Sequence, residues 1–143
     1  MAEKMRCGGA GIPSFYTQTG VGTSVGNGGI PIKFGSHGLP EILSKKKESK
    51  IYDGLEYILE TSILGDFSLI KAWKADEKGN VVFRKSARNF NPDAAVAGRI
   101  CIVEVEEIVP VGAIDPDDVH LPSIYVNRFF KGIFEKRIEV LRT

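Results

Sequence analysis

The first 38 residues carry the features best suited to chemistry, because ten of the chain's 16 glycines lie there. Residues 8–13 and 19–23 hold more glycine than a surface linker needs, and glycine permits positive φ angles and close backbone approach. Free backbone N–H groups in such a loop are suited to a phosphate, a carboxylate or a thioester carbonyl oxygen. Phe15 and Tyr16 would wall an acyl pocket beside them. A glycine loop that only packs against a sheet explains the same composition.

The other reactive residues form no familiar catalytic pattern. The sequence has no P-loop, dinucleotide fingerprint, nucleophile elbow or His-x-x-x-His pair, and His37 and His120 lie in predicted loops. Asp115, Asp117 and Asp118 lack the spacing of a calcium loop and are interpreted as turn residues. The two cysteines have neither disulfide-framework nor zinc-site spacing.

The composition is that of a single soluble globular domain. With 143 residues, 43% hydrophobic and 26% charged, the chain is unlike disordered, collagen-like or coiled-coil proteins. The net charge of +1 provides no field for a polyanion, so no nucleic-acid partner is expected. No stretch approaches the roughly 18 apolar residues of a membrane span, and no targeting segment is readable. Cys101 is predicted to be buried and Cys7 to be incidental.

The elements expected in the first 60 residues are a long loop and one hairpin. Residues 8–38 are expected to be largely loop because they are rich in glycine. The polar residues 35–50 end in a lysine-rich run and are interpreted as an exposed, mobile insertion. Asp53 and Gly54 lie between two apolar runs, which predicts a β-hairpin over residues 51–59.

The order strand, helix, strand after residue 65 indicates the α/β class. Residues 67–75 predict a core strand, and a turn leads to a second strand at 81–83. Asn91 is expected to cap a helix with Pro92 at its first position. Residues 100–106 start with a continuous apolar run, which predicts a strand buried on both faces in a parallel sheet. The last segments are predicted as a docking segment or final strand (124–130) and a surface or partner-facing tail (131–143).

Four segments, in this order, resemble the family I coenzyme A transferases. They are GGAGIPSFYTQTGVGT (8–23), GDFSLIKAWKAD (65–76), GNVVFRKSARNFN (79–91) and VEVEE (103–107). The resemblance runs over essentially the whole chain. It implies an α/β fold, namely part of an open, Rossmann-like α domain with a glycine-rich loop and a β-hairpin insertion. Residues 1–143 would be part of that domain, with residues 24–50 as a flexible insertion and Met1 internal to a longer frame.

The resemblance implies a transferase that moves CoA from succinyl-CoA to a 3-oxo acid such as acetoacetate, in ketone-body catabolism. In the family a glutamate carboxylate forms an anhydride and then a glutamyl-CoA thioester, and CoA passes to the acceptor acid. That glutamate belongs to a second (β) domain or subunit, so no glutamate of this chain takes the role, and this chain alone would be inactive. No metal or bound organic cofactor is implied, since the CoA thioester is a substrate.

In the family the glycine loop faces the active-site cleft between the two domains. The positions that carry over as substrate-binding residues are Gly9, Gly11, Pro13, Phe15, Tyr16, Thr17, Thr19 and Gly20. The implied partners are acyl-CoA and 3-oxo acid substrates, the β domain or subunit, and further copies of the full enzyme. Residues 24–50 resemble the longer version typical of the animal enzyme, which implies the mitochondrial matrix.

Two interpretations from other classes stay open. One is a non-catalytic module that occupies the partner surface of a complete transferase subunit. The other is a small module that binds an anion or CoA through the glycine loop alone.

Overall fold

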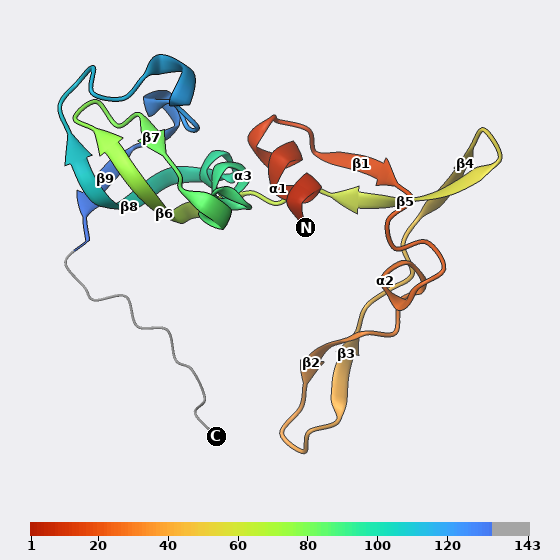
Figure 1. Ribbon diagram of the computed structural model, residues 1–143. Coiled ribbons are helices and arrows are strands. Elements are labelled where there is room, and N and C mark those ends of the chain that lie inside the picture. The colour runs from red at the N-terminus through yellow and green to blue at the C-terminus, as the bar shows by residue number, and fades with distance from the viewer. Residues whose placement is uncertain (133–143) are drawn as a thin grey trace, which may run out of the picture. The chain divides into compact units, whose positions relative to one another are not determined.

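The computed structural model describes residues 1–132, which divide into two compact units, residues 1–63 and residues 64 onward (Figure 1). The length by itself predicts one domain, whereas the internal contacts separate these two units. Residues 133–143 of the predicted tail lie outside the described residues. Within residues 1–132, no helix combines the length and the apolar character that a membrane crossing requires.

The first unit is built from antiparallel strands and two short helices. Strand β5 lies at the centre of a three-stranded sheet of order β1-β5-β4, and β2 and β3 form a separate hairpin. Residues 8–38 therefore hold two strands and a helix, and the prediction of a loop is only partly right, because β1 forms by pairing with a distant strand. The elements are α1 (Ala2–Gly9), β1 (Ser14–Thr17), α2 (Ser24–Asn27), β2 (Pro31–Phe34), β3 (Pro40–Leu43), β4 (Ser49–Tyr52) and β5 (Leu55–Thr61).

The predicted β-hairpin is confirmed as β4 and β5. Tyr52 lies opposite Leu55, and Asp53 and Gly54 form the two-residue turn with φ angles of 49° and 79°. Positive φ at both turn positions matches the right-handed twist of the flanking strands. Aspartate tolerates this conformation and glycine adopts it without a steric penalty, so this pair specifies the turn locally.

Residues 35–50 are mostly exposed, as predicted, and the longer segment of residues 24–50 has regular structure. It contains α2, and every residue of β2 and β3 is exposed. Lys33 of β2 pairs with Glu41 of β3 at 2.8 Å across the hairpin. The flexibility of this segment stays a prediction.

The second unit is built on a four-stranded sheet of order β7-β6-β8-β9. β6 pairs in parallel with β8, and β8 pairs in parallel with β9, while β7 is an antiparallel edge strand. The predicted strand, helix, strand order is therefore confirmed, and of the two alternatives for residues 124–130 a final strand is observed, over Arg128–Lys131. The elements are β6 (Gly65–Asp76), β7 (Val81–Val82), α3 (Asn91–Ala97), β8 (Gly98–Val109) and β9 (Arg128–Lys131), with 3-10 turns at Lys85–Arg88, Pro116–Asp118 and Ser123–Tyr125.

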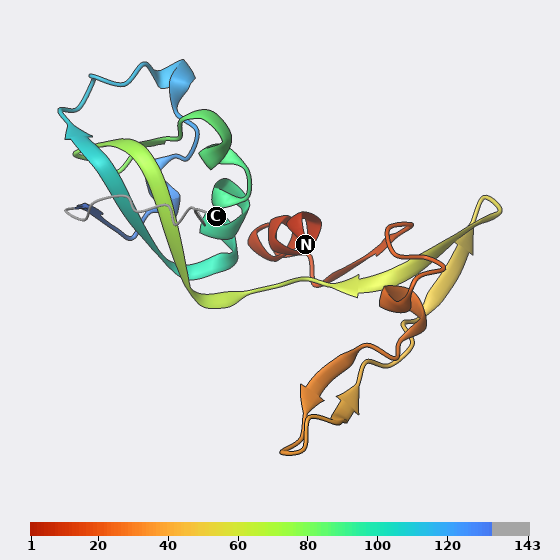
Figure 2. The ribbon, with the colours of Figure 1, turned by 60° about the horizontal axis from the view of Figure 1, so that its bottom comes forward.

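The core of the second unit lies where helix α3 covers one face of the sheet, as both ribbon views show (Figure 2). Ala95 of α3 packs with residues from the strands and from the connection before β9. Cys101 is fully buried, as predicted. The buried cluster comprises Ile70, Ala72, Ala75, Val81, Phe83, Ala95, Cys101, Val103, Val105 and Leu121.

Strand β8 is buried on one face only, so the prediction of burial on both faces is wrong for the described residues. Val103 and Val105 point into the core, whereas Ile102 between Cys101 and Val103 is half-buried. The alternation arises because α3 covers a single face. On neighbouring β6, Leu69 is 78% exposed.

Helix α3 begins one residue before the predicted position, at Asn91, and Asn91 is not its cap. The Asn91 Oδ1 accepts a hydrogen bond from the Lys71 N–H at 3.3 Å, and its Nδ2 donates to the Ala87 carbonyl at 2.6 Å. Phe90 precedes the helix and makes no side-chain cap bond. The Asn91 side chain therefore joins the turn before the helix to β6 and does not serve the first N–H groups of α3.

Candidate functional site

The glycine loop uses its own N–H groups to close helix α1. The N–H groups of Ala10, Gly11 and Ile12 donate to carbonyls in the last turns of α1 at 2.8–3.1 Å. Gly11 has a φ of 73°, a left-handed conformation that commonly ends helices. These three N–H groups are occupied, so the hypothesis of free anion-binding donors is wrong at these positions. A module that binds anions through these three N–H groups loses support for the same reason.

Three other predicted positions have roles in the backbone path. Gly9 lies in the last turn of α1 and not in the loop, and Pro13 is exposed just before β1. Gly20 has a φ of 96°, and a Cβ there would lie 3.2 Å from the Ile58 Cδ1. Because Ile58 is 3% exposed, glycine at this position lets the turn pack against the buried side chain.

Phe15, Thr17 and Thr19 share one pocket of about 240 Å³ in the first unit. Phe15 and Thr17 lie on the same face of β1, since side chains alternate along a strand. The Thr17 Oγ1 accepts a hydrogen bond from the Thr19 N–H at 3.1 Å, which orders the turn after β1. The pocket is lined by Met1, Ala2, Glu3, Lys4, Phe15, Thr17, Thr19 and Glu60.

Tyr16 lies in a different environment. Its hydroxyl donates to the Glu48 Oε1 at 2.5 Å, and its ring meets the Tyr52 ring edge-on with centroids 5.6 Å apart. The bond to Glu48 raises the pKa of Tyr16 above its ordinary value, although Lys50 opposes this. Tyr16 and Phe15 do line a second pocket together, of about 300 Å³, beside buried Cys7.

Three charged residues that sequence reasoning missed lie at the first pocket or directly beside it. Glu60 is the cross-strand partner of Phe15, and it accepts hydrogen bonds from the Lys4 Nζ at 3.2 Å and from the Lys47 Nζ. Burial acts to raise the pKa of Glu60, but the bonds from Lys47 and Lys4 outweigh it, so the pKa lies below its ordinary value. The sequence held one signal for this site, since Glu60 lies two residues after the apolar Ile58 and therefore on the same face of β5.

The remaining polar candidates have structural roles. The Asp115 Oδ1 accepts from the Asp117 N–H at 2.9 Å, which confirms its interpretation as a turn residue. The His120 Nδ1 accepts from the Phe83 N–H at 2.9 Å, and the two rings stack. Within residues 1–132, no three His, Cys, Asp or Glu side chains gather in a way that would hold a metal ion.

Sequence comparisons identify close relatives. The family profile described as Coenzyme A transferase matches residues 1–132. Succinyl-CoA:3-ketoacid coenzyme A transferase 2A, mitochondrial, from Rattus norvegicus is 53% identical over 144 residues, which cover 100% of this chain and 28% of the rat protein. One subunit of the succinyl-CoA:3-ketoacid coenzyme A transferase from Helicobacter pylori strain J99 is 54% identical over 100% of this chain and 54% of its own length. The chain thus spans roughly a quarter to a half of these relatives.

Solved structures agree on the fold. An acyl-CoA transferase from Escherichia coli O157:H7, in a thioester complex with CoA, superposes with a TM-score of 0.69 at 22% identity, over 90% of this chain and 25% of that one. Glutaconate coenzyme A-transferase from Acidaminococcus fermentans gives a TM-score of 0.69 at 19% identity, over 90% and 42% of the two chains. These likenesses confirm the predicted α/β class with open sheets. The profile match over residues 1–132 places the chain in the coenzyme A transferase family.

Proposed function

We propose that this chain is part of an enzyme that transfers CoA from succinyl-CoA to a 3-oxo acid such as acetoacetate. The supporting observation is 53–56% identity, across 97–100% of the chain, to relatives named succinyl-CoA:3-ketoacid coenzyme A transferase in rat, Helicobacter and Xanthomonas. Sequence identity carries this proposal and the TM-scores do not, because one fold supports many functions.

The pocket of Phe15, Thr17 and Thr19 would form one wall of the acyl site. The proposed reaction passes through an anhydride and a thioester, both of which water can hydrolyse, and the Phe15 ring would exclude water from them. The Thr17 Oγ1 accepts one hydrogen bond and keeps its own O–H to donate to an acyl oxygen. Gly9, Gly11, Pro13 and Gly20 would set the backbone path of this wall, and Tyr16 would support it from its other face.

The attacking glutamate would come from a β domain or subunit, and the full enzyme would be a homo-oligomer of such pairs. The bacterial relatives are each named as one subunit of the transferase, which supports a partner subunit. No bound cofactor is needed in this scheme, since the CoA thioester is itself the substrate.

A mitochondrial matrix location follows the names of the mammalian relatives. The Helicobacter relative matches the whole chain, residues 24–50 included, at a similar identity. The length of that segment therefore does not discriminate between a mitochondrial and a bacterial parent, and the location depends on the lineage of the parent protein.

A chimeric enzyme tests the proposal. This chain replaces the 144 matched residues of the Helicobacter relative, and the chimera is purified with its partner subunit. We expect acetoacetyl-CoA to form from succinyl-CoA and acetoacetate. A folded, assembled chimera that transfers CoA to other acids but not to 3-oxo acids would contradict the proposed substrates. Assembly with no transfer at all would favour the non-catalytic interaction module.

The role of Phe15 is tested in the same chimera. Phe15→Ala should raise the ratio of acyl-CoA hydrolysis to CoA transfer about tenfold, because water then reaches the intermediates. Phe34→Ala is the matched control, since Phe34 is a 59% exposed phenylalanine on β2. Unchanged transfer and unchanged hydrolysis in Phe15→Ala would remove the pocket from the mechanism.

A further inference from the structure

The ion pairs at the pocket beside Phe15 leave one positive charge without a matching negative charge, because two lysines pair with a single glutamate. Lys4 and Lys47 both bind the carboxylate of Glu60, and among residues 1–132 Glu60 is the one ion-pair partner of either lysine. Glu3, the other carboxylate at the pocket, pairs with Arg6 at 2.6 Å. Two ammonium groups thus share one carboxylate.

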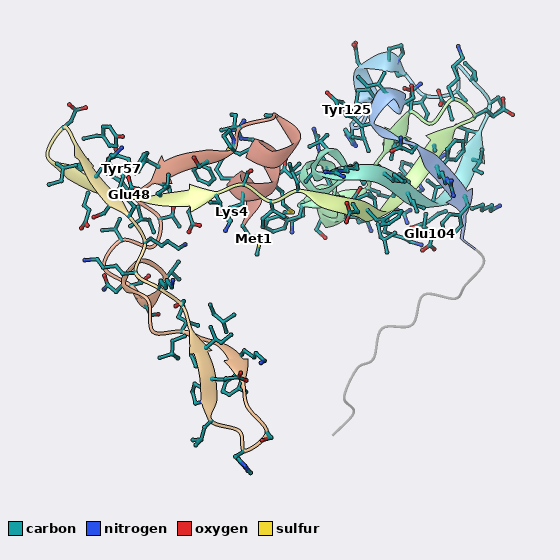
Figure 3. All side chains as sticks on the ribbon, turned by 180° about the vertical axis from the view of Figure 1, so that it is seen from behind. Met1, Lys4, Glu48, Tyr57, Glu104 and Tyr125 are labelled. Atoms are coloured by element: carbon teal, nitrogen blue, oxygen red, sulfur yellow. The ribbon has the colours of Figure 1, made fainter. Side chains whose placement is uncertain are left out.

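Partial burial makes this excess charge significant. The side chains of Lys4, Lys47 and Glu60 are 27%, 26% and 12% exposed. Two cations near each other repel more strongly where water screens them less, and one lysine is enough to neutralise Glu60. A second anion in the pocket would balance the pair. Figure 3 shows Lys4 of helix α1 close to Met1, which precedes the helix, and both lie next to β5, which carries Glu60.

The donors available at this point suit a carboxylate. The Lys4 ammonium has three N–H groups and gives one to Glu60, so two can reach a ligand. Thr17 and Thr19, which each carry a hydroxyl, line the same pocket, and Phe15 contributes an apolar ring to it. A volume of about 240 Å³ is below the roughly 300–1,000 Å³ of sites that hold whole ligands, which suits the end of an acyl group.

We propose that Lys4, held in place by Glu60, binds the free carboxylate of a dicarboxylic acyl group, such as the far end of succinyl-CoA. Lys4 would then determine specificity, because a monocarboxylic acyl chain leaves its ammonium without an anion. The inference rests on the proposed function, since it names what the same pocket recognises. Charge-assisted hydrogen bonds between an ammonium and a carboxylate are among the stronger polar contacts in proteins.

The kinetic test uses the assembled enzyme and two donors that differ in one group, succinyl-CoA and butyryl-CoA. Lys4→Gln should lower kcat/KM for succinyl-CoA about tenfold, mainly through KM, and leave butyryl-CoA within twofold. Lys4→Arg should restore most of the loss because it keeps the charge. Lys33→Gln, at an exposed lysine that is also paired with a glutamate, is the matched control and should change neither donor.

The outcomes separate this role from the alternatives. An equal loss for both donors would overturn the proposal, because Lys4 would then act on the CoA phosphates or only on the fold. The thermal midpoint of the Lys4→Arg variant shows whether it folds like the parent. If it does, and the variant still does not restore the use of succinyl-CoA, the proposal also fails.

A binding experiment distinguishes a failure of this inference from a failure of the proposed function. The full chain is titrated with succinate and with butyrate, and the backbone amide signals of Lys4, Thr17 and Thr19 are followed by NMR. Succinate should shift them, butyrate should not, and Lys4→Gln should abolish the shifts. If these shifts appear but the enzyme uses no 3-oxo acid, the proposed function fails and the carboxylate site stands. If succinate shifts none of them, the carboxylate site is refuted whatever the enzyme transfers.

Discussion

The two units of the chain are stabilised by different physical means. Residues 64–132 bury ten side chains in one cluster, whereas Cys7 and Ile58 are the buried hydrophobic residues described in residues 1–63. The first unit depends instead on tight turns, close glycine contacts and ion pairs around Glu60. The candidate site lies in this less apolar unit. The polar side chains of the candidate site therefore lie in the unit with few buried apolar residues, whereas the second unit is stabilised by its own apolar core.

The largest expected effect comes from the core of the second unit. Phe83 is 3% exposed within the buried cluster, and Phe83→Ala should lower the free energy of unfolding of that unit by about 3–5 kcal/mol, because it leaves a cavity. The single tryptophan, Trp73, lies on β6, so its fluorescence in urea reports on this unit.

The matching change in the first unit should have little effect. Phe34→Ala removes a ring that is 59% exposed, and its effect should stay within about 0.5 kcal/mol. NMR signals of residues 31–43 in urea give this measurement. If Phe83→Ala and Phe34→Ala lowered the free energy of unfolding by similar amounts, the two units would not differ in how much they depend on buried apolar side chains.

An effect smaller than that of Phe83→Ala is expected at the glycine contacts of the first unit. A Cβ at Gly28 would lie 2.7 Å from the Ser44 carbonyl oxygen, whereas a Cβ at Gly29 would meet no atom within 4 Å. Both positions have positive φ angles, of 83° and 87°, so Gly29→Ala controls for backbone strain. Gly28→Ala should cost about 1–3 kcal/mol more than Gly29→Ala. Hydrogen exchange of the Lys47 N–H, which donates to the Gly26 carbonyl at 2.9 Å, is the measurement, and equal exchange in both variants would refute the contact argument.

A modest effect is expected from the pH dependence that Glu60 gives the first unit. Its pKa in the folded state lies below the ordinary value of 4.5, so the ionised carboxylate stabilises the fold above that pH. This contribution is lost as the pH falls through the folded-state pKa. Glu60→Gln should remove about 1 kcal/mol of acid-sensitive stability. Urea midpoints of NMR signals from residues 1–63, measured between about pH 6 and pH 3, should fall for the parent and stay flatter for the variant; parallel curves would exclude this role.

Local signals in the sequence predicted the elements that depend on few residues. The Asp53-Gly54 turn needs only neighbouring residues, and so does a helix start close to Pro92; both are observed, with the helix beginning at Asn91. Strand β1 was missed because its partner, β5, lies far along the chain. Asn91 was assigned to the helix cap, yet its side chain bonds to the Lys71 N–H of β6, a contact that no neighbouring residue indicates.

The candidate site divides in the same way. Phe15, Thr17 and Thr19 belong to one short segment and line one pocket. The glycine-rich composition pointed to Phe15 as a pocket wall, and the family resemblance added Thr17 and Thr19. Lys4, Lys47 and Glu60 come from three separate elements, and their meeting depends on the pairing of β1 with β5 and on the position of α1. Charged residues are common in any chain, so their types alone did not single them out.

The α/β class, the order strand, helix, strand in the second unit, the family resemblance and Phe15 as a pocket residue were readable from the chain as written, because they depend on residue type and short-range spacing. The occupied N–H groups of the glycine loop, the one-sided burial of β8 and the charge excess around Glu60 came from tertiary structure. Hydrogen-bond partners and burial depend on which distant segments pack together, and side-chain pattern does not specify that pairing by itself.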